Sequence, residues 1–313
     1  GELETFTSFD KFYNAVIKQW KDLIETTISV SSAYEKYLAY INPSNMYSAT
    51  IEGAMKKGVD AYQCGVKFNN SSILNSGFAD LIDSLMAVKE FVYDKKTVSL
   101  ETLKSALDSN WAGYEELRTE IHKSKHKYGN NDLETDIYAE ALSSYHTTKI
   151  NNRPNARGGV YKASIHSAME FVWEGEKTTA IPNGRHSREE LSKNASPCVG
   201  MDKNGVTALI NSALTAKPYS YCESYCIDIM LHTSAVSGDE GMEIMKSLLF
   251  TYMKHGRVCM QFNIFDVNTL KDAQKLPEKY QNLQVRVCGW NVLWNNLSEK
   301  EQNTYITRAE NIR

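Results

Sequence analysis

The chain has 313 residues, 42% of them hydrophobic, and a formal net charge of −3 at pH 7, a composition typical of a globular protein with a large core. This near-neutral charge excludes the strongly basic surface that nucleic acid or an anionic membrane would require. No apolar run approaches the roughly 20 residues that cross a bilayer, and Gly1–Glu4 does not begin a signal peptide. We therefore expect a cytoplasmic protein with no nucleic-acid and no membrane partner.

The first half of the chain is predicted to be mainly helical. Ser8 is a candidate N-cap for a helix in which Phe9, Phe12 and Val16 begin an apolar stripe at helical spacing. Ser99 is a candidate cap near the start of another helix, over residues 98–107. The same periodicity predicts four more helices, over residues 51–66, 78–92, 132–146 and, more briefly, 166–173.

Loops and a few strands dominate the second half. Residues 151–159 and 175–205 are rich in polar and turn-forming residues, and a connection as long as the second is usually functional. The elements predicted after them are a helix over residues 238–255, a strand over 258–265, a short helix over 268–274 and a final helix to about residue 311. Ser298 and Glu301 form the capping box of that last helix. The pattern predicts a helix-rich α/β fold with sparse strands.

The cysteines indicate a reducing compartment, because a chain of this size does not need a disulfide scaffold. They are Cys64, Cys198, Cys222, Cys226, Cys259 and Cys288. Cys222 and Cys226 are four residues apart, and so are His122 and His126, but neither pair has further ligands at the spacing of a zinc site. We expect no metal site, and a solvated basic surface around the two histidines.

Two short runs of strand-forming residues flank Gly289. Val285 and Val287 precede it, and Val292 and Trp294 follow it. Glycine permits backbone angles that are closed to other residues, so these residues alone favour a hairpin or tight turn between two strands.

The segments around this glycine resemble the C-terminal signature of the glycyl radical enzymes, the family of pyruvate formate-lyase. The signature comprises residues 261–266, 269–273, 277–280, 284–294, 297–302 and 307–310. Four earlier segments recur in the same order in that family, at residues 79–85, 129–132, 182–185 and 200–205. The resemblance therefore spans nearly the whole chain.

The resemblance implies that Gly289 stores an organic radical. Loss of one Cα hydrogen from glycine gives a planar radical delocalised over the flanking amide groups, and a side chain would obstruct both planarity and close approach. The neighbours of the radical in its loop are then Arg286, Val287, Cys288 and Trp290.

Gln261 and Asn263 lie on one face of the strand predicted over residues 258–265. Two interpretations stay open for them: they hydrogen-bond the glycine loop, or they close an ordinary barrel ladder. By the resemblance, residues 1–255 are the C-terminal part of a ten-stranded α/β barrel, and residues 256–313 form the glycine radical domain.

In that family a cysteine on a separate loop passes its hydrogen to the glycyl radical and then attacks the substrate as a thiyl radical. None of the six cysteines here stands in that context, so we expect the chain to be the C-terminal half of a larger catalytic unit. The implied partners are a cysteine-bearing N-terminal half or partner chain, in a homodimer or heteromer, and a radical S-adenosylmethionine activating enzyme. No bound cofactor is expected, and the radical implies anaerobic, oxygen-sensitive metabolism.

The expected reaction is homolytic cleavage of a C–C or C–heteroatom bond in a small polar metabolite, as in a dehydratase or lyase. A formate C-acetyltransferase is the alternative, but Cys288, Trp290 and Asn183 replace residues that are usual in the best-known members of the family. A second alternative is a non-catalytic spare part, which would need only the last part of this chain. A third, a relative of the anaerobic ribonucleotide reductases, would need a four-cysteine zinc site near the C-terminus, which this sequence lacks.

Overall fold

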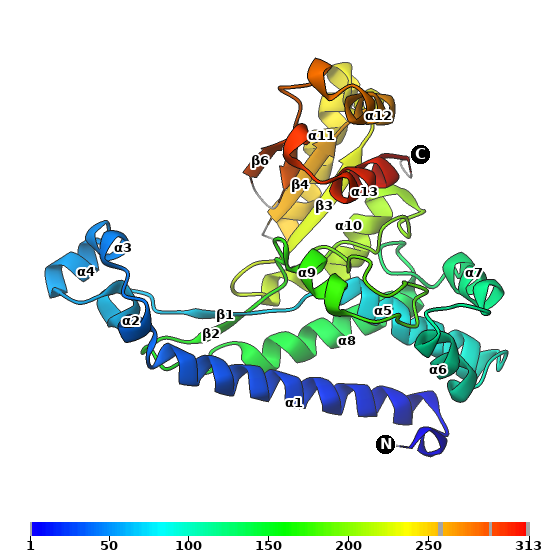
Figure 1. Ribbon diagram of the computed structural model, residues 1–313, viewed down its shortest axis with the longest axis horizontal. Helices are drawn as coiled ribbons and strands as arrows, with labels where there is room; N and C mark the ends of the chain where they lie inside the picture. The colour runs from blue at the N-terminus through cyan, green and yellow to red at the C-terminus, as the bar shows by residue number, and fades with distance from the viewer. Residues whose placement is uncertain (1, 256–258, 288–289, 311–313) are drawn as a thin grey trace.

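The computed structural model describes residues 2–255, 259–287 and 290–310, so Cys288 and Gly289 lie outside the described residues. Figure 1 shows one long helix, α1 (Phe9–Glu35), along one side of the molecule, with a small helical lobe at its far end. Two strands run alongside α1, and the C-terminal segment lies on the opposite side of the molecule.

Capping explains where α1 begins, as predicted. The hydroxyl of Ser8 accepts a hydrogen bond from the Lys11 amide at 3.4 Å. The lobe beyond α1 contains α2 (Leu38–Ile41), α3 (Asn45–Ala49) and α4 (Glu52–Lys57). The helix predicted over residues 51–66 is confirmed only in its first part: α4 ends at Lys57, before Gly58, whose φ of +64° is left-handed.

Most helices of the central body agree with the predicted periodicity, whereas the sequence does not predict α7 (Glu115–Lys123) or α10 (Gly205–Thr215). α5 (Phe78–Ala87) continues as a π-helical segment over Val88–Asp94, and α6 (Leu100–Asp108) begins after Ser99, whose hydroxyl accepts from the Thr102 amide at 3.1 Å. The other helices are α8 (Leu133–Ile150), α9 (Glu170–Lys177) and α11 (Gly238–His255). The predictions over 78–92, 98–107, 132–146 and 238–255 are confirmed, whereas the short helix predicted over 166–173 begins only at Glu170. Within the described residues, no helix is both long enough and apolar enough to span a membrane.

Four parallel strands lie side by side in the order in which they occur in the chain. β1 (Ser71–Leu74) pairs with β2 (Tyr161–Ser164), and β3 (Cys226–Leu231) pairs with β4 (Cys259–Ile264). A parallel bridge between Ser164 and Ser224 joins the two pairs. Of these strands the sequence predicts only β4. β1 and β2 are too short to show a period, and β3 is a short run, buried at all but one position, that periodicity cannot tell from a buried helix segment. The helix-rich α/β fold is confirmed.

The C-terminal segment packs around a small core of its own. It contains α12 (Val267–Lys275), the antiparallel pair β5 (Gln284–Val287) and β6 (Trp290–Leu293), and α13 (Glu299–Glu310). Its buried side chains are Leu270, Ala273, Val285, Trp294, Tyr305, Ile306 and Ala309. The predicted capping box is confirmed, because the Ser298 amide donates to the Glu301 carboxylate at 2.8 Å and the Glu301 amide donates to the Ser298 hydroxyl at 3.3 Å. The strand pair predicted around Gly289 is confirmed as well.

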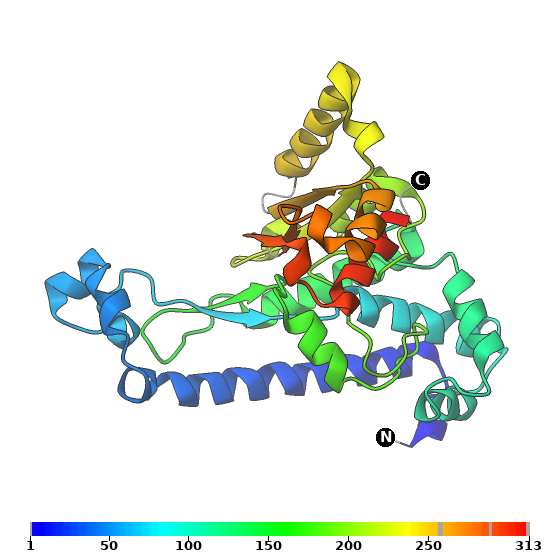
Figure 2. The same cartoon turned by 45° about the horizontal axis from the view of Figure 1, so that its top comes forward.

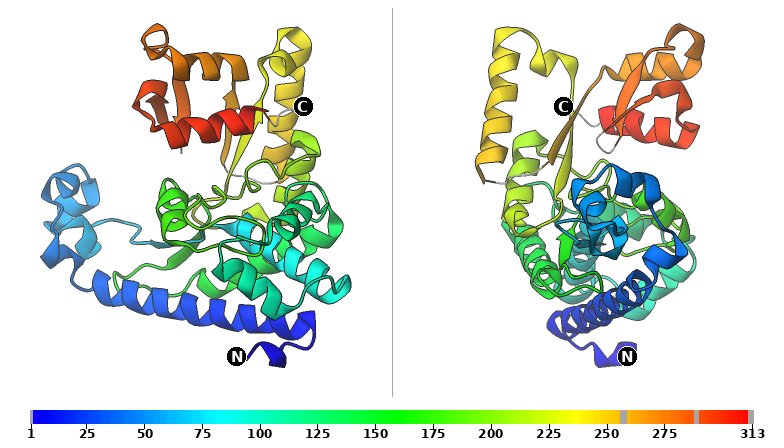
Figure 3. Two further views of the ribbon diagram at one scale, coloured as in Figure 1. Left: turned by 45° about the vertical axis from the view of Figure 1, so that its right-hand side comes forward. Right: turned by 90° about the vertical axis from the view of Figure 1, so that its left-hand side faces the viewer.

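The main hydrophobic core lies where α1, α5, α8 and α10 meet one face of the strands. Its buried members include Phe78, Ile82, Leu142, Ile210 and Ile227. α11 stands out from the body in Figure 2 and reaches this core through Tyr252. Figure 3 shows β3 and β4 between α11 on one side and the orange-to-red C-terminal segment on the other, so the two faces of these strands meet different surroundings.

Burial of His146 predicts a pH dependence of stability. The imidazole lies on α8, stacks on the Trp20 indole with ring centroids 5.6 Å apart, and is 2% exposed. Burial lowers the pKa of His146 from 6.5 to about 4, because the interior disfavours the charged imidazolium. The unfolded chain accepts a proton that the folded chain resists, so this histidine costs stability progressively as pH falls from 6.5 to about 4.

When the pH falls from about 7 to about 4.5, the free energy of unfolding should decrease less in His146→Phe than in the parent chain. We expect the two decreases to differ by about 2–3 kcal/mol. The comparison of the two chains separates the contribution of His146 from that of buried carboxyl groups that titrate in the same pH range. Urea unfolding of both chains at the two pH values measures the difference. Equal losses in both chains would contradict the assignment.

Candidate radical site

β3 and β4 present one apolar and one polar face. The strands pair in register from Cys226↔Cys259 to Leu231↔Ile264, and successive side chains point to opposite faces. The apolar face packs into the main core and consists of Ile227, Ile229, Leu231, Met260, Phe262 and Ile264. The polar face consists of Cys226, Asp228, Met230, Cys259, Gln261 and Asn263. Since Asp228, Gln261 and Asn263 are nonetheless buried, other polar groups have to satisfy them.

Asn263 contacts the strand that leads to Gly289. Its side-chain oxygen accepts a hydrogen bond from the backbone amide of Arg286 at 3.3 Å. The hydroxyl of Tyr305, on α13, donates to the backbone carbonyl of Arg286 at 3.0 Å. Both backbone groups of Arg286 are therefore held, one by β4 and one by the last helix, three residues before Gly289.

Gln261 contacts β3 rather than β5 in the part of the chain that is described. Its amide nitrogen lies 3.2 Å from the sulfur of Cys226, and its oxygen is buried without a hydrogen-bond partner among the described groups. Gln261 and Asn263 thus share the polar face but have different contacts, and only the second reaches the strand before Gly289 through a described hydrogen bond.

The residues next to Gly289 belong to the β5–β6 pair. Val287 and Trp290 are register partners at its end, and the two residues between them, Cys288 and Gly289, lie outside the described residues. The Arg286 guanidinium donates to the Asn291 side chain at 3.2 Å across the pair. The structure therefore describes the two strand ends between which the expected radical residue lies.

A buried ion pair lies on the polar face beside these residues. The ammonium of Lys193 is 2.7 Å from the carboxylate of Asp228, and their side chains are 3% and 5% exposed. Asp228 also accepts a hydrogen bond from the Asn194 side chain at 2.6 Å, and its amide donates to the Ser196 hydroxyl at 2.8 Å. Sequence reasoning missed this pair, because Lys193 belongs to the long polar loop, where a lysine is normally solvated.

The long loop also contains a buried contact between an amide and a carboxylate. Asn183 donates to the buried Asp80 carboxylate at 2.8 Å, and the Ser192 amide donates to its other oxygen at 2.5 Å. Burial raises the pKa of Asp80, and it raises the pKa of the neighbouring Asp83 to about 6. The side chain of Asn183 is a neutral amide, so it adds no further negative charge beside these two buried carboxyl groups. Arg185 is also buried and donates to backbone carbonyls of the loop, so it stabilises the loop from within.

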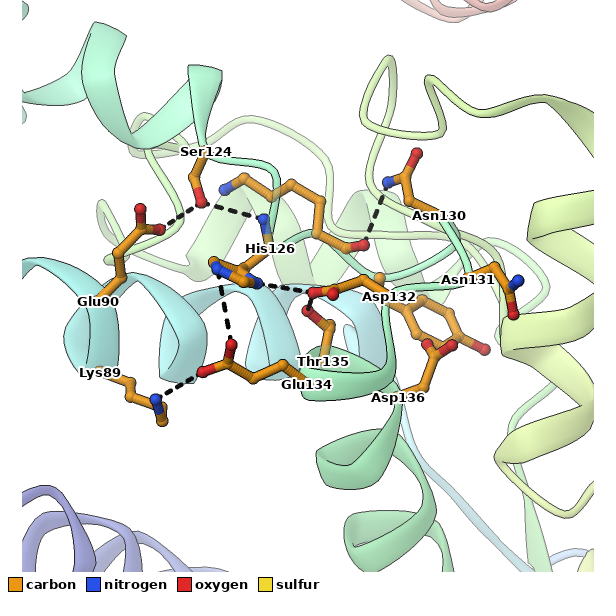
Figure 4. A network of polar contacts seen from close by, with 12 residues as sticks. Lys89, Glu90, Ser124, His126, Asn130, Asn131, Asp132, Glu134, Thr135 and Asp136 are labelled. Atoms are coloured by element: carbon orange, nitrogen blue, oxygen red, sulfur yellow. Dashed lines mark hydrogen bonds and ion pairs between the residues drawn. The ribbon is translucent and has the colours of Figure 1, made fainter. Parts of the chain in front are cut away.

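The two histidines that are four residues apart in the sequence have separate environments. α7 ends before His126, so this residue is not on the helix that carries His122. Figure 4 shows His126 between two carboxylates, with Nδ1 2.7 Å from Asp132 and Nε2 3.7 Å from Glu134, which also pairs with Lys89. The expected basic surface is therefore a network of mixed charge. Among the described residues, no group of three or more His, Cys, Asp or Glu side chains is arranged to hold a metal ion.

We expect Lys193→Ala to destabilise the chain by about 3–5 kcal/mol, because it leaves the Asp228 carboxylate buried without its cation. The double variant Lys193→Met/Asp228→Leu should recover most of that loss, since it removes both charges. Lys271→Ala is the matched control: it breaks a half-exposed pair with Glu310 and should cost less than about 1 kcal/mol. Chemical unfolding measures all three. A Lys193→Ala loss no larger than that of the control would refute the assigned role.

Two family models match the chain. The model described as pyruvate formate lyase-like matches residues 1–175, and the model described as glycine radical matches residues 191–295, which include Gly289. The domain boundary expected after residue 255 stays a prediction.

Named relatives and solved structures match nearly the whole chain. Trans-4-hydroxy-L-proline dehydratase of Clostridioides difficile is 32% identical over 99% of this chain and 39% of its own length. Isethionate sulfite-lyase of Desulfovibrio desulfuricans is 31% identical over 99% of this chain and 38% of its own. This chain superposes on a solved structure from work on 1,2-propanediol dehydration in Roseburia inulinivorans with a TM-score of 0.91. The two are 32% identical, and the match covers 98% of this chain and 40% of the solved one.

The chain thus spans about two fifths of the length of the curated relatives it matches. The match to the pyruvate formate lyase-like model covers more than half of the chain, and the glycine radical match covers the strands around Gly289. The chain therefore belongs to the pyruvate formate lyase-like family, the family of the glycyl radical enzymes, and carries a glycine radical domain.

Proposed function

We propose that this chain is the radical-bearing part of a glycyl radical enzyme, with Gly289 as the residue that stores the unpaired electron. Gly289 lies inside the segment that matches the glycine radical model, and this observation carries the proposal. A cysteine-bearing N-terminal half or partner chain completes the catalytic unit, as a homodimer or heteromer. A separate radical S-adenosylmethionine enzyme removes the glycine hydrogen, in an anaerobic cytoplasm.

The proposed cycle moves one hydrogen atom at a time. The radical at Gly289 takes the hydrogen of a cysteine thiol outside this chain, which leaves glycine and a thiyl radical. The thiyl radical takes a hydrogen from a substrate carbon, and the substrate radical then loses its leaving group from the neighbouring carbon. The product radical regains a hydrogen from the thiol, and the resulting thiyl regains one from Gly289.

Within this cycle, the described residues keep the radical-bearing loop in place. Asn263 and Tyr305 hold the backbone of Arg286, and Val285 is buried in the small C-terminal core. Hydrogen transfer requires the two reacting atoms to be held at a defined separation, so a loop whose preceding strand is anchored serves it better than a free one.

A dehydratase or lyase reaction on a small polar metabolite is supported better than formate C-acetyltransferase chemistry. The named relatives reported above are a dehydratase and a sulfite-lyase. Cys288, Trp290 and Asn183 also depart from the residues usual in pyruvate formate-lyase. A non-catalytic spare part is supported least, because the pyruvate formate lyase-like match begins at residue 1, far upstream of the glycine radical segment.

We further propose that residues 1–255 form the C-terminal part of a ten-stranded α/β barrel and that residues 256–313 form its glycine radical domain. The parallel pairs β1–β2 and β3–β4, joined by one bridge, support the barrel, and β4 is then the strand with which residues 256–313 continue the sheet. The buried polar face of β3 and β4 supports it too, because large barrels enclose ligand cavities. The remaining strands then belong to the cysteine-bearing half.

Anaerobic activation followed by electron paramagnetic resonance tests the proposal. The parent chain, assembled with its cysteine-bearing complement and the activating enzyme, should give a doublet signal that Gly289→Ala abolishes. Gly113→Ala, at an exposed turn, is the matched control and should retain the signal. Air exposure after activation should cut the backbone at Gly289, which mass spectrometry detects. A fully activated complex without a signal, or a signal that persists in Gly289→Ala, would overturn the proposal.

Asn263→Ala should lower the yield of the radical. The variant removes the acceptor for the Arg286 amide, and such a hydrogen bond contributes about 1 kcal/mol, or about a five-fold change in the population of the ordered strand. Spin counting after activation compares it with Asn268→Ala, which alters an exposed asparagine on α12. If the two variants give equal spin yields, the hydrogen bond from Arg286 has no part in holding the loop.

A further inference from the structure

Two thiols on the polar face have no part in the proposed cycle. Cys226 on β3 and Cys259 on β4 are register partners, and both are free. Partners in adjacent parallel strands lie about 4.8 Å apart and project to the same face. That separation falls within the range of about 4.4–6.8 Å between the Cα atoms of disulfide-bonded cysteines. A disulfide between them therefore needs little movement of the backbone.

The two sulfurs have unequal environments. Cys226 is completely buried, and its sulfur accepts a hydrogen bond from Gln261 at 3.2 Å. Cys259 is partly exposed at the start of β4. Its hydrogen bond with Cys226 lowers the pKa of Cys259 to about 7, and the charges of Arg286 and Lys193 act in the same direction, against burial and Asp228. The same contact and burial raise the pKa of Cys226. The partly exposed thiol is thus the more acidic of the two, and the buried thiol keeps its proton more strongly.

None of the other described cysteines combines a lowered pKa with a second cysteine as its register partner. Cys64 and Cys222 are exposed, and neither is the register partner of another cysteine. Burial and the nearby Asp80 raise the pKa of Cys198 well above its usual value, so this sulfur is a poor nucleophile. Among the cysteines that the structure describes, only the two on β3 and β4 are partners in register.

We propose that Cys259 and Cys226 form a redox-reactive dithiol that a hydroperoxide converts into a disulfide between β3 and β4. The Cys259 thiolate attacks one oxygen of hydrogen peroxide, the O–O bond breaks, and hydroxide leaves, which gives a sulfenic acid. The sulfur of Cys226 then attacks the Cys259 sulfur, loses its proton and displaces water. Two thiols are oxidised to one disulfide, and one peroxide is reduced to two molecules of water.

The disulfide would lie on the same face as Asn263, the residue that holds the strand before Gly289. It would also remove the thiol that Gln261 contacts. Oxidation would therefore alter the polar face on which Asn263 holds the strand that leads to Gly289. The proposal does not depend on the radical chemistry proposed above, and it is tested on the chain without activation.

The test is limited oxidation followed by peptide mapping. The reduced chain is treated with hydrogen peroxide, quenched with acid, blocked with N-ethylmaleimide and digested with trypsin without reduction. Cys259 lies in its own tryptic peptide, whereas the peptide of Cys226 also contains Cys222. We expect a linked pair of these peptides in the parent chain and in the control Cys222→Ser. In Cys226→Ser we expect no link, and dimedone should trap a sulfenic acid on Cys259.

Two results would overturn the proposal. One is a Cys259 that stays fully available to N-ethylmaleimide after an excess of peroxide, in the parent chain itself. The other is a link that persists in Cys226→Ser, because it would then join Cys259 to Cys222. The labelling of the parent chain does not require any variant to fold, and it requires no activating enzyme. Failure here is therefore distinguishable from failure of the radical assignment.

Discussion

The buried polar face of β3 and β4 is the constraint on which the rest of the structure depends. A polar group without water needs a partner, and two of the buried groups on this face have theirs in segments outside the two strands. Asp228 uses Lys193 from the long loop, and Asn263 uses the backbone before Gly289. The long loop and the C-terminal segment are thus fixed to the sheet by the same requirement. The apolar face of the strands, in contrast, packs on helices as in any α/β protein.

This arrangement suits a residue that stores a reactive electron. A radical on a Cα atom persists only where water, oxygen and mobile side chains are kept away. The C-terminal segment has its own small core around Val285 and Trp294, which holds the strands on both sides of Gly289. Its contacts with the body include the hydrogen bond of Asn263, the packing of Ala168, Met169 and Met230 on its core, and a hydrogen bond from the Lys300 ammonium to the Arg188 carbonyl. The segment thus packs around its own core and lies against the polar face.

Local signals explain the part of the fold that could be predicted from the sequence. Local hydrogen bonds form each of the caps at Ser8, Ser99 and the Ser298–Glu301 box. Each serine hydroxyl accepts from an amide three residues away, so these caps can be identified without knowledge of the fold. Contacts across the chain could not be predicted in this way. Asn263 and Arg286 are 23 residues apart, and Lys193 and Asp228 are 35 apart. In a single sequence, a lysine in a polar loop has the same appearance whether it is solvated or paired.

The strands around Gly289 show a further limit of local pattern. Valines and tryptophans flanking a glycine predict a strand pair, and the observed pair agrees. An ordinary hairpin would contain the same strand pair. The radical role of Gly289 is therefore inferred from the family match and not from the local sequence pattern. Periodicity likewise failed at residues 51–66, where apolar spacing continued past Gly58 although the backbone turned there.

The most direct test replaces hydrogen by deuterium at the α-carbon of every glycine. The chain contains 17 glycines, but only the one that bears the spin affects the resonance. The single hydrogen left on a glycyl α-carbon splits the signal into a doublet, and deuterium couples far more weakly. Collapse of the doublet to a single line in the activated, deuterated protein is the predicted result. An unchanged doublet would put the spin on another residue type and contradict the assignment of Gly289.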